Sequence, residues 1–406
     1  RTLEAAMQQF SERGPNQARM AKTSHHRVAN ARKAYTGMYQ GLLNPAVLKR
    51  KLADEKKLIN RFNEKGKKKS NQWTVIEKAQ KKLANFEKAY ALLERGDAFY
   101  SELFDIARDI LRLTEEMKKP SAKRLREYRD SRLESLKFQL FSSAPIDKEL
   151  ERVKLATSLS FLAENLGGSH PVVKKVFAGK APMDRATELV NGCTLLDVNV
   201  RKKLVEGGVD AVKKANDPMI ELARVVDGAA RKLRQKYSTE IEEVERQAYA
   251  KIADVRFQVY GRSVAPDATF TLRLAFGTVQ GYEEEGNKIP FATTFGGAFE
   301  RAELQKHVDP FVLPSRWLKG KSKVNLKTPF DFVSTADTIG GNSGSPVLNR
   351  DGELIGINFD RNRHGLVRNF VYTDHQARHI SVHGLGVIEA LKKLYKAESV
   401  LKEILQ

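Results

Sequence analysis

The decisive stretch of this sequence reads Thr335-Ala336-Asp337-Thr338-Ile339-Gly340-Gly341-Asn342-Ser343-Gly344-Ser345-Pro346-Val347. Its three glycines permit backbone conformations that other residues avoid, so they predict a tight turn around Ser343. Asp351-Gly352 follows between short apolar runs and is typical of a two-residue hairpin turn. The stretch therefore predicts a serine on a tight turn within an antiparallel β domain.

This stretch resembles the nucleophile loop of chymotrypsin-fold serine peptidases. Such enzymes need backbone amides already in position to meet the oxyanion of the tetrahedral intermediate. The resemblance implies that Ser343 is the nucleophile and that the amides of Gly341 and Ser343 are the oxyanion donors. A Gly-x-Ser-Gly turn alone is common in β proteins, but this match continues through Pro346-Val347 and the return segment 352–356.

The residues around this loop have the composition and the alternating pattern of a β domain. After Arg256, short β-branched and aromatic stretches alternate with Gly, Pro and Asp turns. In Thr269–Phe276 the residues alternate with period two, which places Phe270, Leu272, Leu274 and Phe276 on one face of a half-buried strand. We expect further strands at residues 257–260, 278–282, 331–333, 345–348, 354–358 and 370–372. Helical spacing returns over Gly384–Leu405.

The residues before this domain are predicted to be helical. From Thr2 to about Ala253 apolar residues recur at intervals of three and four, and prolines are few. Asp217-Pro218, a capping residue followed by proline, starts one long amphipathic helix that reaches Ile252. The predicted fold is α+β. Residues 1–253 form an all-helical domain, and residues 254–406 form a chymotrypsin-like β-barrel, the second barrel of a double-barrel serine peptidase, with a C-terminal helix.

Composition excludes several classes of protein. With 406 residues and 41% hydrophobic content the chain can bury a core, and no apolar run approaches the roughly 18 residues of a membrane span. One cysteine excludes an intrachain disulfide framework and a cysteine-clustered zinc site. We therefore expect no metal, no cofactor and no membrane span. The net charge of +21 names no partner, because runs such as Lys65–Lys69 read as solvated helix faces.

The catalytic base is not recognisable in this chain. A serine nucleophile needs a base, normally a histidine oriented by a carboxylate. None of the eight histidines lies in the usual setting on a barrel strand, and chymotrypsin-like chains carry the histidine and aspartate on a first barrel ahead of the serine barrel. The chain starts at Arg1 without an apolar signal region. We expect a fragment that lacks this first barrel and is inactive on its own.

The helical block ahead of a serine barrel is similar to the bacterial dipeptidyl-peptidase 7 and dipeptidyl-peptidase 11 family, peptidase family S46. In that family a helical domain is inserted in a chymotrypsin-fold double barrel and caps its cleft. Besides the serine loop, the similarity rests on residues 29–42, 184–208, 217–220, 266–274 and 377–382. The resemblance implies release of dipeptides from free peptide N-termini and a periplasmic or cell-surface location. We also expect a homodimer.

The resemblance also assigns substrate-binding residues. In this family an asparagine of the helical domain and an aspartate after the return strand hold the substrate ammonium, and these fall on Asn30 and Asp360. An arginine after that aspartate accompanies preference for Asp or Glu before the cut, and here it is Arg361. Its guanidinium can pair bidentately with a carboxylate. The continuation Asn362-Arg363-His364 departs from the family's pattern.

Two other functions remain open from the sequence. The chain could be a serine endopeptidase with a helical substrate platform, because the serine loop alone cannot measure substrate length. It could also be a basic helical nucleic-acid-binding module fused to a degenerate barrel. Such modules interleave aromatic residues with a basic face, whereas only Trp73 lies near Lys65–Lys69. Nucleic acid is therefore not an expected partner.

Overall fold

The computed structural model describes residues 1–64, 71–263 and 272–405. The chain divides into two compact units, of which the first comprises Arg1–Arg32 with Ile59–Val264 and the second Lys33–Leu58 with Ala265–Gln406. Helix α2 (Pro15–Leu43) gives its start to the first unit and its end to the second. Among the described residues no helix is long and apolar enough to cross a membrane.

The first unit is helical, as predicted. Besides the start of α2 and the end of α3 (Pro45–Glu64), its elements are α1 (Thr2–Ser11), α4 (Gln72–Ala84), α5 (Glu87–Ala89), η1 (Tyr90–Glu94), α6 (Glu102–Glu116), η2 (Ser121–Lys123), η3 (Arg126–Tyr128), α7 (Asp130–Leu140), α8 (Lys148–Leu166), α9 (Pro171–Phe177), α10 (Pro182–Gly192), α11 (Val198–Glu206), α12 (Gly208–Lys214), α13 (Pro218–Tyr237), η4 (Ser238–Glu242), α14 (Glu243–Tyr260) and η5 (Gly261–Ser263).

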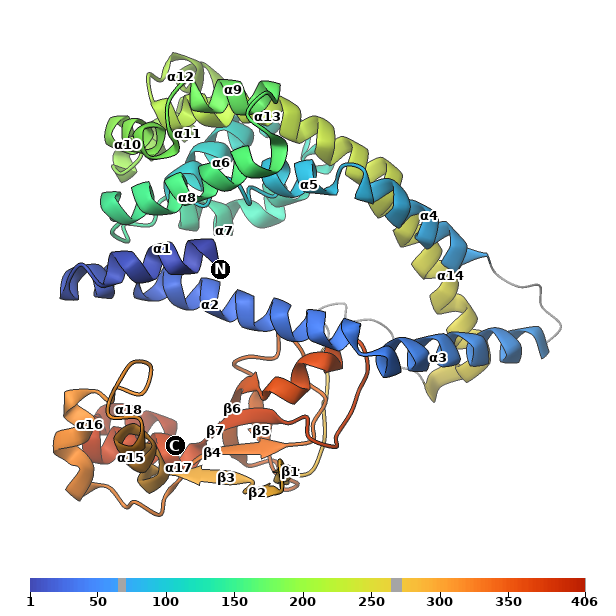
Figure 1. Cartoon of the computed structure of the whole chain (residues 1–406), viewed down its shortest axis with the longest axis vertical. Helices are drawn as coiled ribbons and strands as arrows, with labels where there is room; N and C mark the ends of the chain where they lie inside the picture. Colours follow the sequence, from blue (N-terminus) through green and yellow to red (C-terminus); the bar gives the residue numbers. More distant parts are fainter. Residues whose placement is uncertain (65–70, 264–271, 406) are drawn as a thin grey trace. The chain divides into compact units, whose positions relative to one another are not determined.

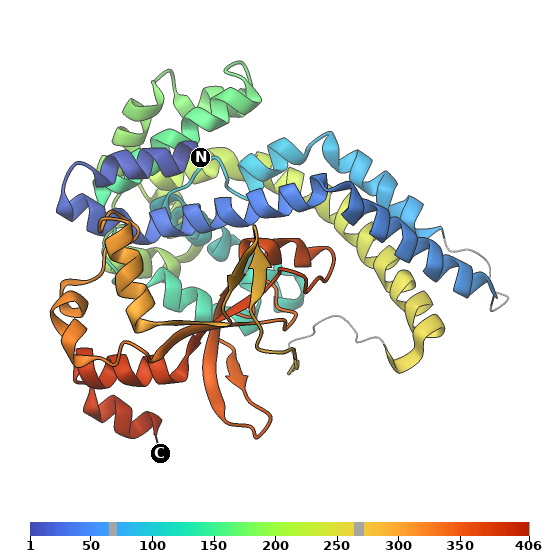
Figure 2. The ribbon, with the colours of Figure 1, turned by 60° about the horizontal axis from the view of Figure 1, so that its bottom comes forward.

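The long helix begins where its sequence signal predicts. The Asp217 carboxylate accepts hydrogen bonds from the amides of Met219 and Ile220, so it caps α13. Helix α13, the π-helical segment η4 and α14 form one continuous rod, beside which α4 packs (Figures 1 and 2). The rod passes the boundary predicted after residue 253 and ends at Tyr260. The strand predicted at residues 257–260 is therefore wrong, because these residues complete the helix.

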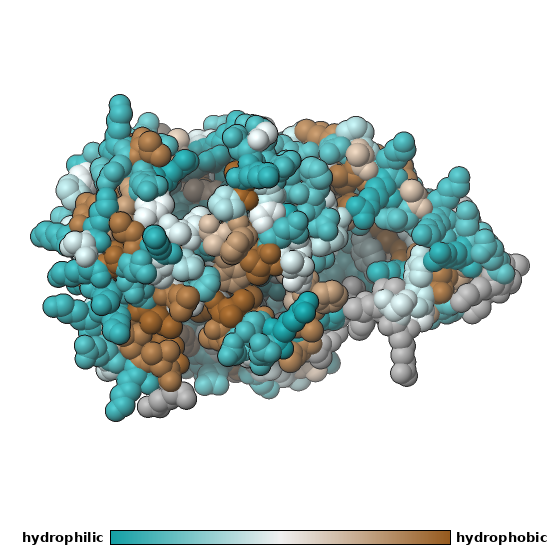
Figure 3. All heavy atoms as spheres, turned by 90° about the horizontal axis from the view of Figure 1, so that it is seen from below, coloured by the Kyte–Doolittle hydropathy of each residue, from teal (hydrophilic) through white to brown (hydrophobic). Residues whose placement is uncertain are grey.

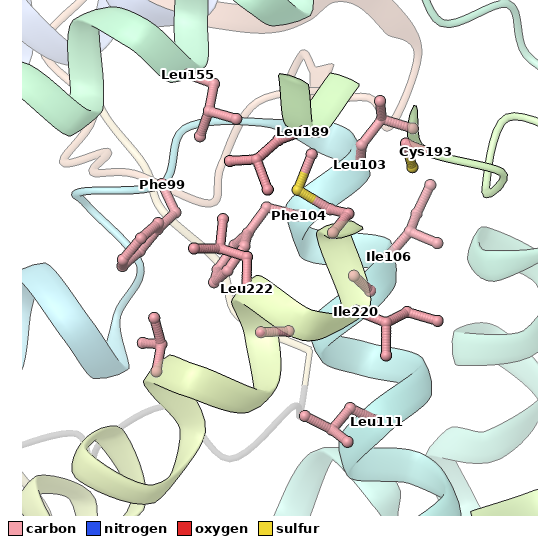
Figure 4. Close-up of a cluster of buried hydrophobic side chains, with 14 of the residues drawn as sticks. Phe99, Leu103, Phe104, Ile106, Leu111, Leu155, Leu189, Cys193, Ile220 and Leu222 are labelled. Carbon is pink, nitrogen blue, oxygen red and sulfur yellow. The ribbon is translucent and has the colours of Figure 1, made fainter. Parts of the chain in front are cut away.

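The core of this unit lies where α6, α8, α10 and α13 meet. Figure 4 shows apolar side chains from these helices pointing toward one another, among them Phe104, Leu155, Leu189 and Leu222, all essentially inaccessible to solvent. A largely buried cluster of three charges joins α6 to η1 and α13. Arg112 donates to Glu94 of η1 and to Asp227 of α13, both over 2.6 Å. Breaking such a buried cluster leaves an uncompensated charge and is strongly destabilising.

The second unit contains a mixed β and helical fold. Besides the end of α2 and the start of α3, its elements are β1 (Tyr282–Glu284), β2 (Asn287–Ile289), β3 (Ala292–Thr294), α15 (Phe295–Leu304), α16 (Ser315–Gly320), η6 (Lys321–Lys323), β4 (Pro329–Ser334), β5 (Pro346–Leu348), β6 (Leu354–Arg361), η7 (Arg363–Asn369), β7 (His379–His383), α17 (Gly384–Glu389), η8 (Ala390–Tyr395) and α18 (Glu398–Ile404).

Its main sheet has five antiparallel strands in the order β3-β4-β7-β6-β5, and β1 and β2 form a separate hairpin. The strands predicted at 331–333, 345–348 and 354–358 correspond to β4, β5 and β6, and the C-terminal helical segment is also confirmed. Within the described ranges no pairing joins β3 to β5, so the sheet is open and not a closed barrel.

Two further strand predictions are wrong. Leu272, Leu274 and Phe276 are exposed and lie outside any strand, whereas residues 269–271 fall outside the described residues. Residues 370–372 form a turn after η7. An alternating face is buried only when another element covers it, and nothing in the described chain covers these side chains. Other apolar side chains are also exposed, as the brown groups on the face in Figure 3 illustrate.

Two glycines let the end of α2 approach η7 closely. A Cβ atom at Gly37 would lie 2.1 Å from Leu366 Cδ1 and 2.9 Å from Leu366 Cβ, and one at Gly41 would lie 3.2 Å from Val367 Cγ2. Gly37 and Gly41 are one helical turn apart and share a face of α2. This glycine face seats η7 directly against the helix backbone.

We predict that Gly37→Ala destabilises the second unit by about 1–2 kcal/mol, because the added methyl overpacks the contact with Leu366. Gly228→Ala is the matched control, since a Cβ at this helical glycine meets nothing within 4 Å. It should stabilise the first unit by about 0.5–1 kcal/mol through helix propensity. Urea unfolding of both variants checks the pair. Equal stabilisation by both substitutions would show that the close approach is absent.

Candidate active site

Ser343 lies on the loop between β4 and β5, and its side chain is exposed. Gly341 has φ of 104° and Gly344 has φ of 87°, conformations that favour glycine and let the chain turn sharply around the serine. The Ser343 hydroxyl donates to the backbone carbonyl of Phe359 on β6 over 3.2 Å. The loop predicted from the sequence is therefore formed, and it is attached to β6.

The amides around Ser343 are arranged unevenly. The amide of Gly344 donates to the Asn358 carbonyl over 2.8 Å, and that of Ser345 donates to the Asn342 carbonyl over 3.0 Å. In contrast, the amides of Gly341 and Ser343 donate to no acceptor in the described part of the chain. An oxyanion hole needs such uncommitted donors. These are the two amides that the sequence resemblance assigns to it.

Asn358 of β6 supports this loop, and the sequence analysis missed it. Its side chain is 4% exposed, and its amide nitrogen donates to the Asn342 carbonyl over 2.9 Å. Its backbone donates to the Ser345 carbonyl over 2.9 Å. A polar residue inside the apolar strand pattern Leu354–Phe359 was the available signal, because a buried amide needs partners.

The end of β6 presents Asp360 through a β-bulge. Asn358 pairs with Ser381 and Asp360 pairs with Ile380, so Phe359 is the extra residue. One Asp360 oxygen accepts the Arg361 amide over 2.8 Å, and the other accepts the Lys33 ammonium of α2, also over 2.8 Å. Bulges commonly re-aim side chains next to active sites. Asp360 thus lies one residue from the carbonyl that holds Ser343.

Arg361 is half-buried and is held by an amide group. Its guanidinium donates to the Asn369 side-chain oxygen over 3.0 Å, and the Asn369 nitrogen lies 2.7 Å from the sulfur of Met38. Burial lowers the pKa of Arg361, while the charges of Asp360 and Asp337 act in the opposite direction. No salt bridge joins Arg361 to a carboxylate in the described chain.

Glu284 binds the side chains of Arg363 and His364, the residues at which the sequence departs from the family's pattern. Both side chains contact Oε1 of Glu284 on β1 over 2.6 Å. The hydrogen bonds from His364 and Arg363 hold the pKa of Glu284 below its usual value. Glu284 is therefore the partner of both side chains, whereas Arg361 has no carboxylate partner among the described residues.

The remaining predicted groups lie as follows. Asn30 belongs to the first unit, is exposed, and precedes Lys33 by one turn of α2. Ser343 makes no hydrogen bond to a histidine within the described residues. The most buried histidine, His379, lies 2.5 Å from the Ser381 hydroxyl, and burial lowers its pKa to about 4. No group of acidic, histidine or cysteine side chains in the described ranges could hold a metal ion.

Comparison with known proteins now identifies the family. A family model described as peptidase S46 matches residues 1–406. The chain therefore belongs to the peptidase S46 family, in agreement with the resemblance found in the sequence.

Individual relatives are similar over parts of the chain. An Asp/Glu-specific dipeptidyl-peptidase of Porphyromonas gingivalis is 31% identical over 274 residues, which cover 64% of this chain and 37% of that protein. Dipeptidyl-peptidase 7 of the same organism is 29% identical over 196 residues, which cover 46% of this chain and 27% of that protein. The aligned segments thus cover well under half of each of these two relatives.

The fold is similar to that of a solved structure. Porphyromonas endodontalis DPP11 in complex with the dipeptide Arg-Glu matches with a TM-score of 0.69 and 22% identity, covering 100% of this chain and 59% of that one. At this identity the match concerns the fold. It agrees with the helical unit and the antiparallel sheets described above.

We predict that Asn358→Ala loosens the Ser343 loop without unfolding the sheet. Loss of one buried hydrogen bond costs about 1 kcal/mol, so the amides of Gly344 and Ser345 should exchange with deuterium about fivefold faster. Asn349→Ala is the matched control, because the hydrogen bonds of the Asn349 side chain to Asp351 and Glu353 lie within the hairpin, away from residues 344 and 345. Unchanged exchange at residues 344 and 345 in Asn358→Ala would contradict the supporting role.

Proposed function

We propose that this chain carries the nucleophile of a serine dipeptidyl-peptidase, which releases dipeptides from peptides with a free N-terminus. The proposal rests on two contacts made at the end of β6. The carbonyl of Phe359 accepts from Ser343, and the carboxylate of the next residue, Asp360, accepts from the ammonium of Lys33 over 2.8 Å. A nucleophile and an ammonium-binding carboxylate are thereby held a short, fixed distance apart. Such spacing suits an enzyme that counts residues from a free N-terminus.

The proposed reaction is acyl transfer through Ser343. The hydroxyl turns from the Phe359 carbonyl to a histidine base, loses its proton and attacks the carbonyl carbon of the second substrate residue. The amides of Gly341 and Ser343 stabilise the oxyanion. The protonated histidine then returns its proton to the leaving amine, and water releases the dipeptide. We propose that this histidine and its aspartate lie on a first barrel, outside the present chain, and that the chain alone is inactive.

Arg361 is the proposed selector of the residue before the cut. Its guanidinium lies next to Asp360 in the chain and is held by the neutral Asn369 amide, so it can pair with a substrate Asp or Glu. Because Arg363 and His364 are already paired with Glu284, they do not compete for that carboxylate. The relative from Porphyromonas gingivalis named Asp/Glu-specific dipeptidyl-peptidase supports the same preference.

Several finer features belong to this proposal. The open sheet would form part of the second of two chymotrypsin-like barrels, and Asn30 would assist Asp360 in binding the substrate ammonium. The helical unit would cap the cleft. A homodimer and a periplasmic or cell-surface location complete the proposal.

We predict that Asp360→Asn in the full-length protein lowers kcat/KM for free-amine peptides about tenfold to a hundredfold. The carboxylate is partly exposed, with 38% of its side chain accessible, so the lost ion pair is screened by solvent. Asn30→Ala should reduce activity less, because a neutral amide contributes a weaker bond. Ser343→Ala is the inactive control. The measurement is hydrolysis of matched peptides with free and acetylated N-termini.

Equal cleavage of acetylated peptides would favour the endopeptidase alternative. Retained activity in Asp360→Asn would show that the ammonium binds elsewhere. Wild-type activity in Asn30→Ala alone would remove only Asn30 from the site.

We predict that Arg361→Gly lowers kcat/KM for substrates with Asp or Glu before the cut by about tenfold to several hundredfold, or roughly 1.5–3 kcal/mol. For substrates with Leu before the cut, kcat/KM should rise, because Leu cannot pair with the half-buried cation that the substitution removes. Arg361→Lys keeps the charge but not the planar fork, so it should retain a weaker acidic preference. Specificity constants for acidic and apolar substrates check this. An unchanged ratio in Arg361→Gly would exclude Arg361 as the selector.

A further inference from the structure

We propose that Lys33 is an internal competitor of the substrate at Asp360, so that a peptide binds only by displacing the lysine ammonium from this carboxylate. The inference rests on the proposed function of Asp360 and adds a residue of α2 that sets affinity and selectivity. Lys33 Nζ lies 2.8 Å from Asp360 Oδ2.

The chemistry of the two cations is the same. A lysine side chain and a peptide N-terminus each present a primary ammonium with three donors. Asp360 Oδ1 already accepts the amide of Arg361 over 2.8 Å. Lys33 is the donor on Oδ2, and a second ammonium on this carboxylate would lie beside it as a like charge. A substrate ammonium placed on Oδ2 must compete with that of Lys33.

The position of Lys33 follows from how α2 docks. Lys33, Gly37 and Gly41 are spaced by four residues and share one helix face. The two glycines seat η7 against this face, and Arg50 of α3 donates to the Tyr372 carbonyl over 3.0 Å. Packing of α2 against η7 thus holds the backbone of Lys33 at a position from which its side chain reaches Asp360.

The pair is weak enough to open. Lys33 has 45% and Asp360 has 38% of the side chain exposed, so solvent screens their attraction. Exposed pairs of this kind change an equilibrium by up to about sixfold. A peptide with a free N-terminus replaces the lost contact, whereas a peptide with a blocked N-terminus leaves Lys33 in place. Lys33 therefore weakens the binding of peptides with a free N-terminus and leaves the binding of blocked peptides unchanged.

The test is Lys33→Met in the full-length protein, with Lys33→Gln as a second variant. KM for free-amine peptides should fall about twofold to sixfold at unchanged kcat, and equally for Glu and Leu before the cut, because the competition concerns only the N-terminus. Lys49→Met is the matched control, since Lys49 is an exposed lysine of α3 without a salt bridge among the described residues. It removes the same charge and should leave KM unchanged.

Two further measurements separate the possible roles of Lys33. On the Ser343→Ala background, the dipeptide Ala-Glu should bind Lys33→Met about twofold to sixfold more tightly in calorimetry. On the Asp360→Asn background, Lys33→Met should have no effect, because the two residues act through one contact. An unchanged or raised KM in Lys33→Met would overturn the proposal, and a raised value would make Lys33 a residue that positions Asp360. Equal cleavage of acetylated peptides by the wild type would instead refute the proposed function, and the Lys33 proposal with it.

Discussion

The hydrogen bonds between β6 and the Ser343 loop are the contacts on which the candidate site depends. Asn358 accepts from the Gly344 amide through its backbone, and its side chain donates to the Asn342 carbonyl. Phe359 accepts from the serine, and the strand then ends in Asp360 and Arg361. One strand therefore aligns Ser343, Asp360 and Arg361, the proposed nucleophile, ammonium-binding carboxylate and selector of acidic residues.

The basic side chains near the site differ in the partners that they bind. The chain carries an excess of 21 positive charges, yet the basic side chains near the site are not equivalent. Glu284 holds Arg363 and His364, a neutral amide holds Arg361, and Asp360 holds Lys33. An ion pair uses a charge that would otherwise attract an anion. The half-buried guanidinium of Arg361 forms no salt bridge within the described residues, so its charge is not used in this way.

Local signals in the sequence predicted much of the architecture. The cap at Asp217, the glycines around Ser343 and the Asp351-Gly352 turn each act within a few residues, so their conformations follow from local chemistry. Alternation without a covering element misled the strand prediction at Leu272, Leu274 and Phe276. The strand prediction at residues 257–260 failed for another reason. Ala248 and Val255 are buried on one face of α14, and the helix continues through residues 257–260 to its end at Tyr260.

The sequence by itself determined the helical unit, the serine turn, the strands β4 to β6 and the family to which the chain belongs. Only the tertiary structure decided what surrounds them. Lys33 meets Asp360 across 327 positions of the chain, and Arg363 meets Glu284 across 79. Neither pair has a local pattern, because a long-range contact arises when packing, here the glycine face of α2 against η7, brings distant segments together.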